Sequence, residues 1–122
     1  MNILVADDSN EVLGLFFRYF SNKGHNLTLV EDGIQAIEKV KTEDYDIAFI
    51  DYCMKHSTGI ETCQAIKKIK PDLKVIIMSG SFPNEEDFRN SIGECQSLIE
   101  GFLCKPFCID DIEKFLHKMV IN

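Results

Sequence analysis

Five polar side chains follow four short apolar runs of the sequence, and together they could form a chemical site. Asp7 and Asp8 follow the first run, Asp51 the third, Ser79 the fourth and Lys105 the fifth. If these runs are parallel strands, their carboxyl ends share one edge of a sheet, which is where open α/β sheets bind ligands. Each residue alone reads more readily as a helix cap, turn or loop residue. Their joint occurrence after four runs favours one shared site.

The chemistry of such a site follows from its charges. Two carboxylates about 4 Å apart repel by about 4 kcal/mol at an effective dielectric constant of roughly 20, so the cluster must protonate or bind a cation. Oxygen ligands without a His or thiolate partner indicate Mg²⁺. Lys105 would add a second positive charge and Ser79 a hydroxyl group. This combination suits phosphoryl transfer to an aspartate nucleophile.

The elements that must position these residues alternate along the chain. The apolar runs are continuous, as is typical of parallel strands covered on both faces, and they span residues 3–6, 27–30, 47–50, 75–78 and 102–104. Five stretches with helical spacing of apolar residues separate or follow them. Strands alternating with helices predict right-handed βαβ units and a parallel sheet between helical layers, an α/β fold.

The apolar faces and ends of the predicted helices can be read from particular residues. The first apolar face includes Phe17, the fourth continues to Ile99, and the last reaches Met119. In chain order, the five faces consist of Leu13, Phe16, Phe17 and Phe20; of Ala36, Ile37 and Val40; of Cys63, Ile66 and Ile69; of Phe88, Ile92, Cys95 and Ile99; and of Ile109, Ile112, Leu116 and Met119. Thr58 with Glu61 predicts a capping box, and Asn84 predicts a helix start. Pro71 should end the third helix.

Composition excludes several classes of protein. The 122 residues predict a single domain, residues 1–122, with no effector domain in the chain. A net charge of −7 argues against direct nucleic-acid binding, and no apolar run approaches the roughly 18 residues of a membrane span. Five cysteines, an odd number without a C-x-x-C pair, argue against a disulfide framework and favour a cytoplasmic location.

Four sequence segments, taken in order and with their spacing, resemble a known family. They are Val5-Ala6-Asp7-Asp8-Ser9, Phe49-Ile50-Asp51-Tyr52-Cys53-Met54, Met78-Ser79-Gly80 and Phe102-Leu103-Cys104-Lys105-Pro106-Phe107. The chain resembles, nearly end to end, the receiver domain of response regulators in two-component phosphorelay signalling. The resemblance implies a flavodoxin-like, doubly wound sheet of five parallel strands in the order 2-1-3-4-5, flanked by five helices.

The resemblance also implies a role for each matching residue. Asp51 would accept the phosphoryl group, and Lys105 and Ser79 would contact it. Mg²⁺ would be held by Asp7, Asp8, Asp51 and the main-chain carbonyl of Cys53. Ser79 and Phe102 would form the switch, and the bond before Pro106 would be cis. The implied partners are a sensor histidine kinase or histidine phosphotransfer protein and a downstream target protein, and a phosphorylation-linked dimer is compatible with the family.

Three features depart from the family pattern. Lys55 stands where the family usually has Pro, which predicts a looser loop around Cys53. The stretch from Ser79 to Lys105 is about four residues longer than in the family, which leaves the fourth helix in question. Phe102 replaces the more common Tyr and, lacking a hydroxyl group, should prefer a buried position.

Other functions fit the sequence less well. A receiver-like protein-binding module that does not turn over phosphate stays open because of Lys55 and the longer stretch after Ser79. A phosphatase with an aspartate nucleophile usually carries a second Asp two residues later, where Cys53 stands. The sequence contains neither a G-x-G-x-x-G nor a G-x-x-x-x-G-K-[ST] motif, so it gives no indication of nucleotide binding. Cys53 with His56 is a weak metal signal, and Cys104 and Cys108 are better read as packing residues than as a redox pair.

Overall fold

A five-stranded parallel sheet forms the centre of the fold. The computed structural model describes residues 1–121, and their side chains through residue 118. The sheet has the order β2-β1-β3-β6-β7, which is the predicted order 2-1-3-4-5 once two short strands outside the sheet are set aside. Its strands are β1 (Asn2–Ala6), β2 (Asn26–Val30), β3 (Ile47–Asp51), β6 (Lys74–Ser79) and β7 (Gly101–Cys104).

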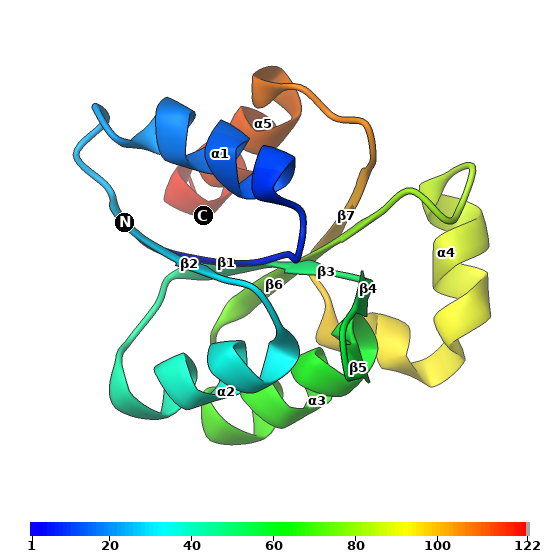
Figure 1. The fold of residues 1–122 in the computed structure, drawn as a ribbon. Helices are drawn as coiled ribbons and strands as arrows, with labels where there is room; N and C mark the ends of the chain where they lie inside the picture. The colour runs from blue at the N-terminus through cyan, green and yellow to red at the C-terminus, as the bar shows by residue number, and fades with distance from the viewer. Residues whose placement is uncertain (122) are drawn as a thin grey trace.

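Helices cover both faces of this sheet (Figure 1). The helices α1 (Asn10–Phe20) and α5 (Ile109–Ile121) cover one face, and α2 (Gly33–Thr42) and α3 (Gly59–Ile69) cover the other. Alternate strand residues supply two separate cores, because successive side chains point to opposite faces. Ile3, Val5 and Phe49 join the core under α1 and α5, whereas Leu4, Ala48 and Ile50 join the core over α2 and α3.

The helices begin where side chains cap them. Ser9 Oγ accepts from the Val12 N–H, Asp32 Oδ1 from the Gln35 N–H and Asn84 Oδ1 from the Asp87 N–H. The predicted capping box between Thr58 and Glu61 is present in both directions and starts α3 directly after the Asp51 loop. The third helix ends at Ile69, ahead of Pro71.

The fourth helix is shorter than its apolar spacing predicts. Helix α4 (Glu85–Ile92) stops at Gly93, whose φ of 58° lies in the left-handed region, and a 3₁₀ helix, η1 (Gly93–Leu98), follows. Cys95 and Ile99 are therefore not on the same α-helix as Phe88. The prediction of one helix to Ile99 was wrong because a 3₁₀ turn also returns side chains to one side every three residues.

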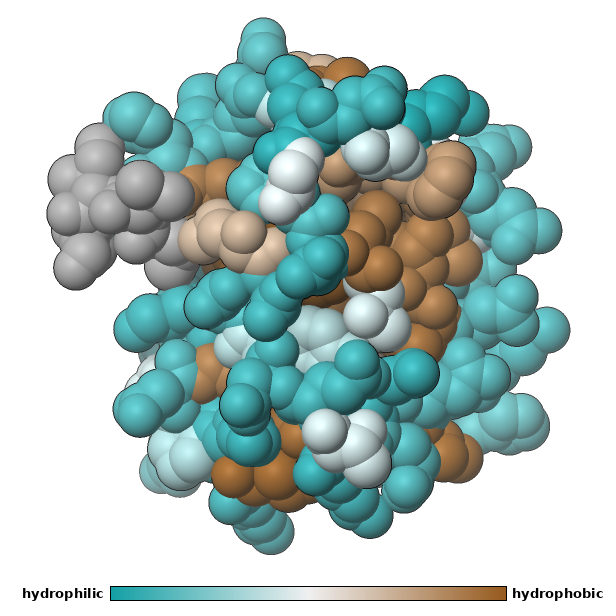
Figure 2. Space-filling model, turned by 90° about the vertical axis from the view of Figure 1, so that its left-hand side faces the viewer, coloured by the Kyte–Doolittle hydropathy of each residue, from teal (hydrophilic) through white to brown (hydrophobic). Residues whose placement is uncertain are grey.

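A second difference concerns the edge of the sheet. The predicted apolar face of α1 includes Phe17, but this side chain is 58% exposed, as is Ile34 on α2. Phe16 and Phe20 are buried, so Phe17 lies at the margin of the apolar stripe rather than within it. Figure 2 shows apolar side chains exposed together toward its right-hand side, where the β2 edge of the sheet lies. Met119, predicted on the apolar face of α5, lies outside the residues whose side chains are described.

None of the helices within residues 1–121 is both long and apolar enough to cross a membrane.

Candidate functional site

Three carboxylates meet at the carboxyl ends of β1 and β3. Asp7 and Asp8 directly follow β1, Asp51 is the last residue of β3, and these two strands are neighbours in the sheet. One carboxylate oxygen from each of the three residues lies within 4.8 Å of the others. Asp7 and Asp51 are buried, whereas Asp8 is exposed to solvent. The sheet therefore brings together acidic residues that are 44 positions apart in the chain (51 − 7).

Lys105 reaches the same place from the end of β7. Its Nζ lies 2.7 Å from Asp7 Oδ2 and 3.0 Å from Asp51 Oδ1, so one ammonium group bridges two buried carboxylates. The backbone N–H of Lys105 donates to the carbonyl of Ser79, which ties the end of β7 to the end of β6. The arrangement combines a compact negative cluster with one fixed positive charge.

The burial of these groups shifts their protonation. Burial, followed by the nearby Asp7 carboxylate, raises the pKa of Asp51 from 3.8 to about 6, although Lys105 opposes this change. Burial alone would lower the pKa of Lys105, but its hydrogen bonds to Asp7 and Asp51 raise it above 10.5. Lys105 therefore stays charged at neutral pH. Additional positive charge near Asp51 would stabilise the ionised form of its carboxyl group.

Backbone contacts hold Asp7 in position. The Ser9 N–H donates to Asp7 Oδ1 at 2.8 Å, which leaves Asp7 Oδ2 for Lys105. The backbone N–H of Asp7 donates to the carbonyl of Val30 and extends the pairing of β1 with β2. Asp7 therefore does not cap α1, since Ser9 does, and its carboxylate is available to the cluster.

Ser79 lies at the carboxyl end of β6 and Phe102 lies within β7, and the two side chains contact different groups. Ser79 is buried at the end of β6, and its Oγ accepts from the Ser81 N–H at 3.0 Å rather than contacting a carboxylate. Phe102 is buried in β7, and its ring stacks on Phe88 with centroids 4.5 Å apart. The bond between Lys105 and Pro106 is cis.

An aromatic group that sequence reasoning missed connects Phe102 with the residue after Asp51. The ring of Phe88 lies 5.8 Å from Tyr52 and 5.4 Å from Phe82, and Tyr52 and Phe82 are 5.3 Å apart. We name Tyr52, Phe82, Phe88 and Phe102 the aromatic cluster. Its members are too far apart in sequence for any periodic pattern to group them.

The loop after Asp51 folds into a small hairpin. The short strands β4 (Cys53–Met54) and β5 (Ser57–Thr58), which were not predicted, pair in antiparallel fashion around Lys55 and His56. His56 has a φ of 71°, the left-handed conformation that tight turns require. The side chain of Cys53 is exposed. The hairpin defines the backbone path around Cys53 even though Lys55 replaces the Pro of the family pattern.

Gly59 is packed against the backbone of this loop. Its N–H donates to the carbonyl of Tyr52 at 2.7 Å, and an added Cβ would press on the Asp51 carbonyl and lie 2.9 Å from Tyr52 Cα. We therefore expect Gly59→Ala to destabilise the protein by about 1–3 kcal/mol, the usual cost of overpacking, in urea unfolding. Gly14→Ala is the matched control, because its Cβ would meet only the end of Arg18 at 3.6 Å and the change favours the helix. Equal effects of the two changes would contradict this view of Gly59.

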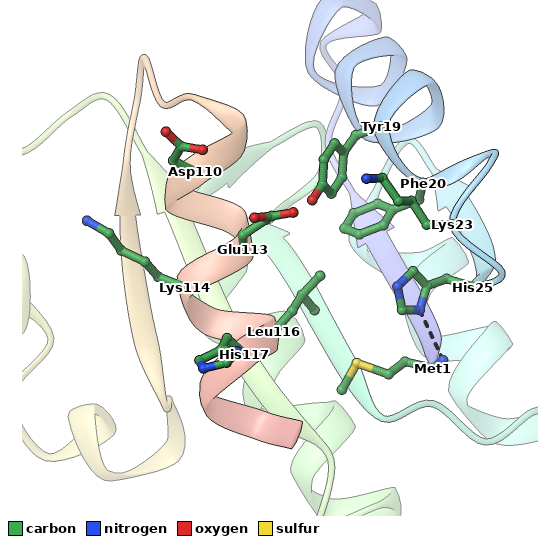
Figure 3. A pocket seen from close by; sticks show the side chains of 10 residues that line it. All are labelled: Met1, Tyr19, Phe20, Lys23, His25, Asp110, Glu113, Lys114, Leu116 and His117. Atoms are coloured by element: carbon green, nitrogen blue, oxygen red, sulfur yellow. Dashed lines mark hydrogen bonds between the residues drawn. The ribbon is translucent and has the colours of Figure 1, made fainter. Parts of the chain in front are cut away.

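A separate hollow lies between α1 and α5 (Figure 3). It has a volume of about 680 Å³, and its walls include Tyr19, Leu116 and His117. At one end, the amino group of Met1 lies 3.1 Å from Nδ1 of His25. Burial, the Met1 amino group and Lys23 lower the pKa of His25, so its ring accepts this contact as a neutral imidazole. None of the acidic residues of the strand-end cluster lines this hollow.

The fold and this acidic cluster define a doubly wound α/β protein with three carboxylates and a lysine at the carboxyl edge of its sheet. Residues 3–117 match the model of the response regulator receiver domain. The chain therefore belongs to the response regulator receiver domain family.

Curated relatives support this membership. The chain is 26% identical to the response regulator receiver protein CpdR of Brucella abortus over 98% of this chain and 96% of CpdR. It is 27% identical to the transcription factor SKN7 of Candida albicans over 99% of this chain, and 23% identical to the response regulator MprA of Mycobacterium avium over 92%. The chain spans only 21% of SKN7 and 47% of MprA, so these relatives carry further regions.

Solved structures share the fold. The response regulator TrrA of Thermotoga maritima, solved in complex with Mg²⁺ and BeF, is 24% identical, with a TM-score of 0.81 and 97% of both chains covered. TrrA has also been solved with the histidine kinase ThkA; there the TM-score is 0.81 and the identity 23%, with 98% of this chain and 97% of TrrA covered. At this identity the likeness demonstrates a common fold.

Proposed function

We propose that this protein is a phosphorelay switch that accepts a phosphoryl group from a phosphohistidine onto Asp51. The observation that carries the proposal is the Lys105 ammonium group, which lies 3.0 Å from Asp51 and 2.7 Å from Asp7. In the transfer, a carboxylate oxygen of Asp51 attacks phosphorus while the bond from phosphorus to the histidine nitrogen breaks. Lys105 is placed to stabilise charge on the transferred oxygens. Membership of the receiver family supports the same role for Asp51.

The carboxylates suit Mg²⁺. Opposite ligands of an octahedral Mg²⁺ are roughly 4.2 Å apart, so oxygens within 4.8 Å of one another could share one ion after a small adjustment. Three carboxylates with one ammonium leave two negative charges uncompensated, and the donor atoms are all oxygen. In this proposal Asp7, Asp8, Asp51 and the Cys53 carbonyl hold the ion, which would supply positive charge to the phosphoryl oxygens.

Phosphorylation would change the surface through groups that are already close to Asp51. Ser79 and Lys105 are joined by a backbone hydrogen bond. Phe102 lies in β7, the strand that ends directly before Lys105. Movement of the Ser79 hydroxyl toward the phosphoryl group would open space that the aromatic cluster fills. A shift of Phe102 and its partners would then alter the surface of α4 and β7 that a downstream target protein reads.

The proposed phosphodonor is a sensor histidine kinase or a histidine phosphotransfer protein. The complex of TrrA with ThkA supports this class of partner. In this proposal, residues 1–122 form one receiver domain. The five cysteines are free, which suits the reducing cytoplasm.

The proposal is tested by phosphorylation with acetyl phosphate. We expect intact-mass measurement to detect one added phosphoryl group in the presence of Mg²⁺ and none when the metal is chelated. In parallel, Mg²⁺ in the millimolar range should shift the NMR signals of residues around Asp51. Absence of both responses would favour the other hypothesis, a receiver-like protein-binding module that does not turn over phosphate.

The raised pKa of Asp51 predicts a dependence of stability on pH in the metal-free protein. Between the unfolded value of 3.8 and the folded value of about 6, the folded state binds more protons than the unfolded state. The contribution of Asp51 to stability therefore increases as pH falls through this range. Relative to Asp51→Asn, we expect the wild type to gain about 1 kcal/mol between about pH 7 and about pH 5 in urea unfolding with a chelator. A constant difference would contradict the raised pKa.

A further inference from the structure

Strand β2 forms an open edge of the sheet. Its inner side pairs with β1, where the Asn26 N–H donates to Met1 and the Val30 carbonyl accepts from Asp7. Because backbone groups alternate in direction along a parallel strand, Leu27 and Leu29 direct their N–H and C=O groups outward. Within residues 1–121 no strand pairs with this edge, so two donors and two acceptors lie along it without a strand partner.

This edge lacks the usual protection against pairing. Exposed edges in monomeric proteins commonly carry charged residues, proline or a bulge. The five residues of β2, Asn26–Val30, include no charged residue and no proline. Next to it Phe17 is 58% exposed, and a hollow of about 490 Å³ is lined by Phe17, Leu27 and Leu29 together with Phe20, Ser21 and His25. We name Phe17, Leu27 and Leu29 the β2 edge patch.

We propose that two copies of this chain associate by antiparallel pairing of their β2 strands. With a two-fold axis at Thr28, Leu27 of one copy lies opposite Leu29 of the other. All outward groups of both strands then pair, giving four hydrogen bonds and one continuous ten-stranded sheet. Registers shifted by two residues keep the same hydrogen-bonding pattern but leave some of the outward N–H and C=O groups unpaired. The axis runs perpendicular to the sheet, so both patches lie on the α1 side and Phe17 from each copy flanks the junction.

Charge complementarity favours a second copy as the occupant. Lys23 precedes β2, and Asp32 follows it. In the proposed register, Asp32 lies beside Lys23 of the second copy. The two-fold axis repeats this pairing, so one strand end attracts the other. The association does not involve Asp51 and should persist in Asp51→Asn.

The test combines association with hydrogen exchange. Sedimentation equilibrium from about 10 µM to about 1 mM, the range in which weak dimers dissociate, should reveal a monomer–dimer equilibrium. At the high concentration, the amides of Leu27 and Leu29 should become protected, and this readout separates the β2 edge from every other dimer surface. A chain that stays monomeric throughout the range, or a dimer whose Leu27 and Leu29 amides exchange as in the monomer, would overturn the proposal.

Matched variants identify the contacts. Phe17→Glu and Phe17→Lys should each weaken the dimer by about tenfold or more, since two buried rings are lost whichever charge is introduced. Gln96→Glu, on η1, adds the same negative charge as Phe17→Glu and should leave the equilibrium unchanged. Unchanged association of both Phe17 variants would overturn the proposal. The amide exchange of the wild type remains decisive if a Phe17 variant does not fold.

Discussion

Replacing Asp51 by Asn is expected to abolish Mg²⁺-dependent labelling by acetyl phosphate. The amide oxygen of Asn is a poor nucleophile, so the bond to phosphorus cannot form at this position. The change keeps the shape of a side chain that is 6% exposed, and it removes a carboxylate that burial and Asp7 hold in an unfavourable charged state. The variant should therefore be folded and, without metal, more stable than the wild type by up to about 3 kcal/mol. Intact-mass measurement and urea unfolding give the two readouts.

The control for this experiment is Asp72→Asn. Asp72 is exposed next to Pro71, and its loss changes the net charge equally without touching the carboxylate cluster. Labelling of this variant should match that of the wild type. Wild-type labelling of Asp51→Asn would remove Asp51 from its proposed role. Equal loss in both variants would mean that overall charge, rather than the Asp51 carboxylate, controls the reaction.

The position of the acidic cluster could be predicted because it depends on strand ends alone. Once the apolar runs before Asp7, Asp51 and Lys105 are assigned as parallel strands, their carboxyl ends must lie at one edge of the sheet. Sequence could not determine that Lys105 divides its two contacts between Asp7 and Asp51 rather than contacting Asp8. That choice depends on the Ser9 N–H, which occupies one oxygen of Asp7, and on side-chain burial.

The predictions that failed depend on backbone details that apolar spacing does not encode. The spacing of Phe88, Ile92, Cys95 and Ile99 continues past Gly93, although the left-handed backbone there ends the α-helix. Similarly, Phe17 follows Phe16 and lies at helical spacing from Phe20, yet it faces an open sheet edge instead of a core. Whether an apolar residue at the margin of a stripe is buried depends on what lies beside the helix, which sequence spacing alone does not reveal.

Replacing Lys105 by Met is expected to destabilise the metal-free protein by about 3 kcal/mol, because it leaves a buried carboxylate without its cation. Asp7 is 0% exposed and Lys105 lies 2.7 Å from it. Met retains most of the length and apolar stem of Lys, so the principal loss is the charge. Urea unfolding with a chelator measures the effect. Adding Asp7→Asn to Lys105→Met should restore most of the loss, since the orphaned charge is then removed.

Lys70→Met provides a control with the same chemical change. Lys70 lies 2.6 Å from Asp44, a distance as short as that between Lys105 and Asp7, but Asp44 is 86% exposed. Water can solvate Asp44 after its partner is lost, so Lys70→Met should cost much less than Lys105→Met. If both variants lost equal stability, the contact distance rather than the burial of Asp7 would determine the effect. Addition of Mg²⁺ should restore stability to Lys105→Met, because a cation bound by the acidic cluster would compensate for the lost Lys105 charge. The stability of Lys70→Met should not change when Mg²⁺ is added.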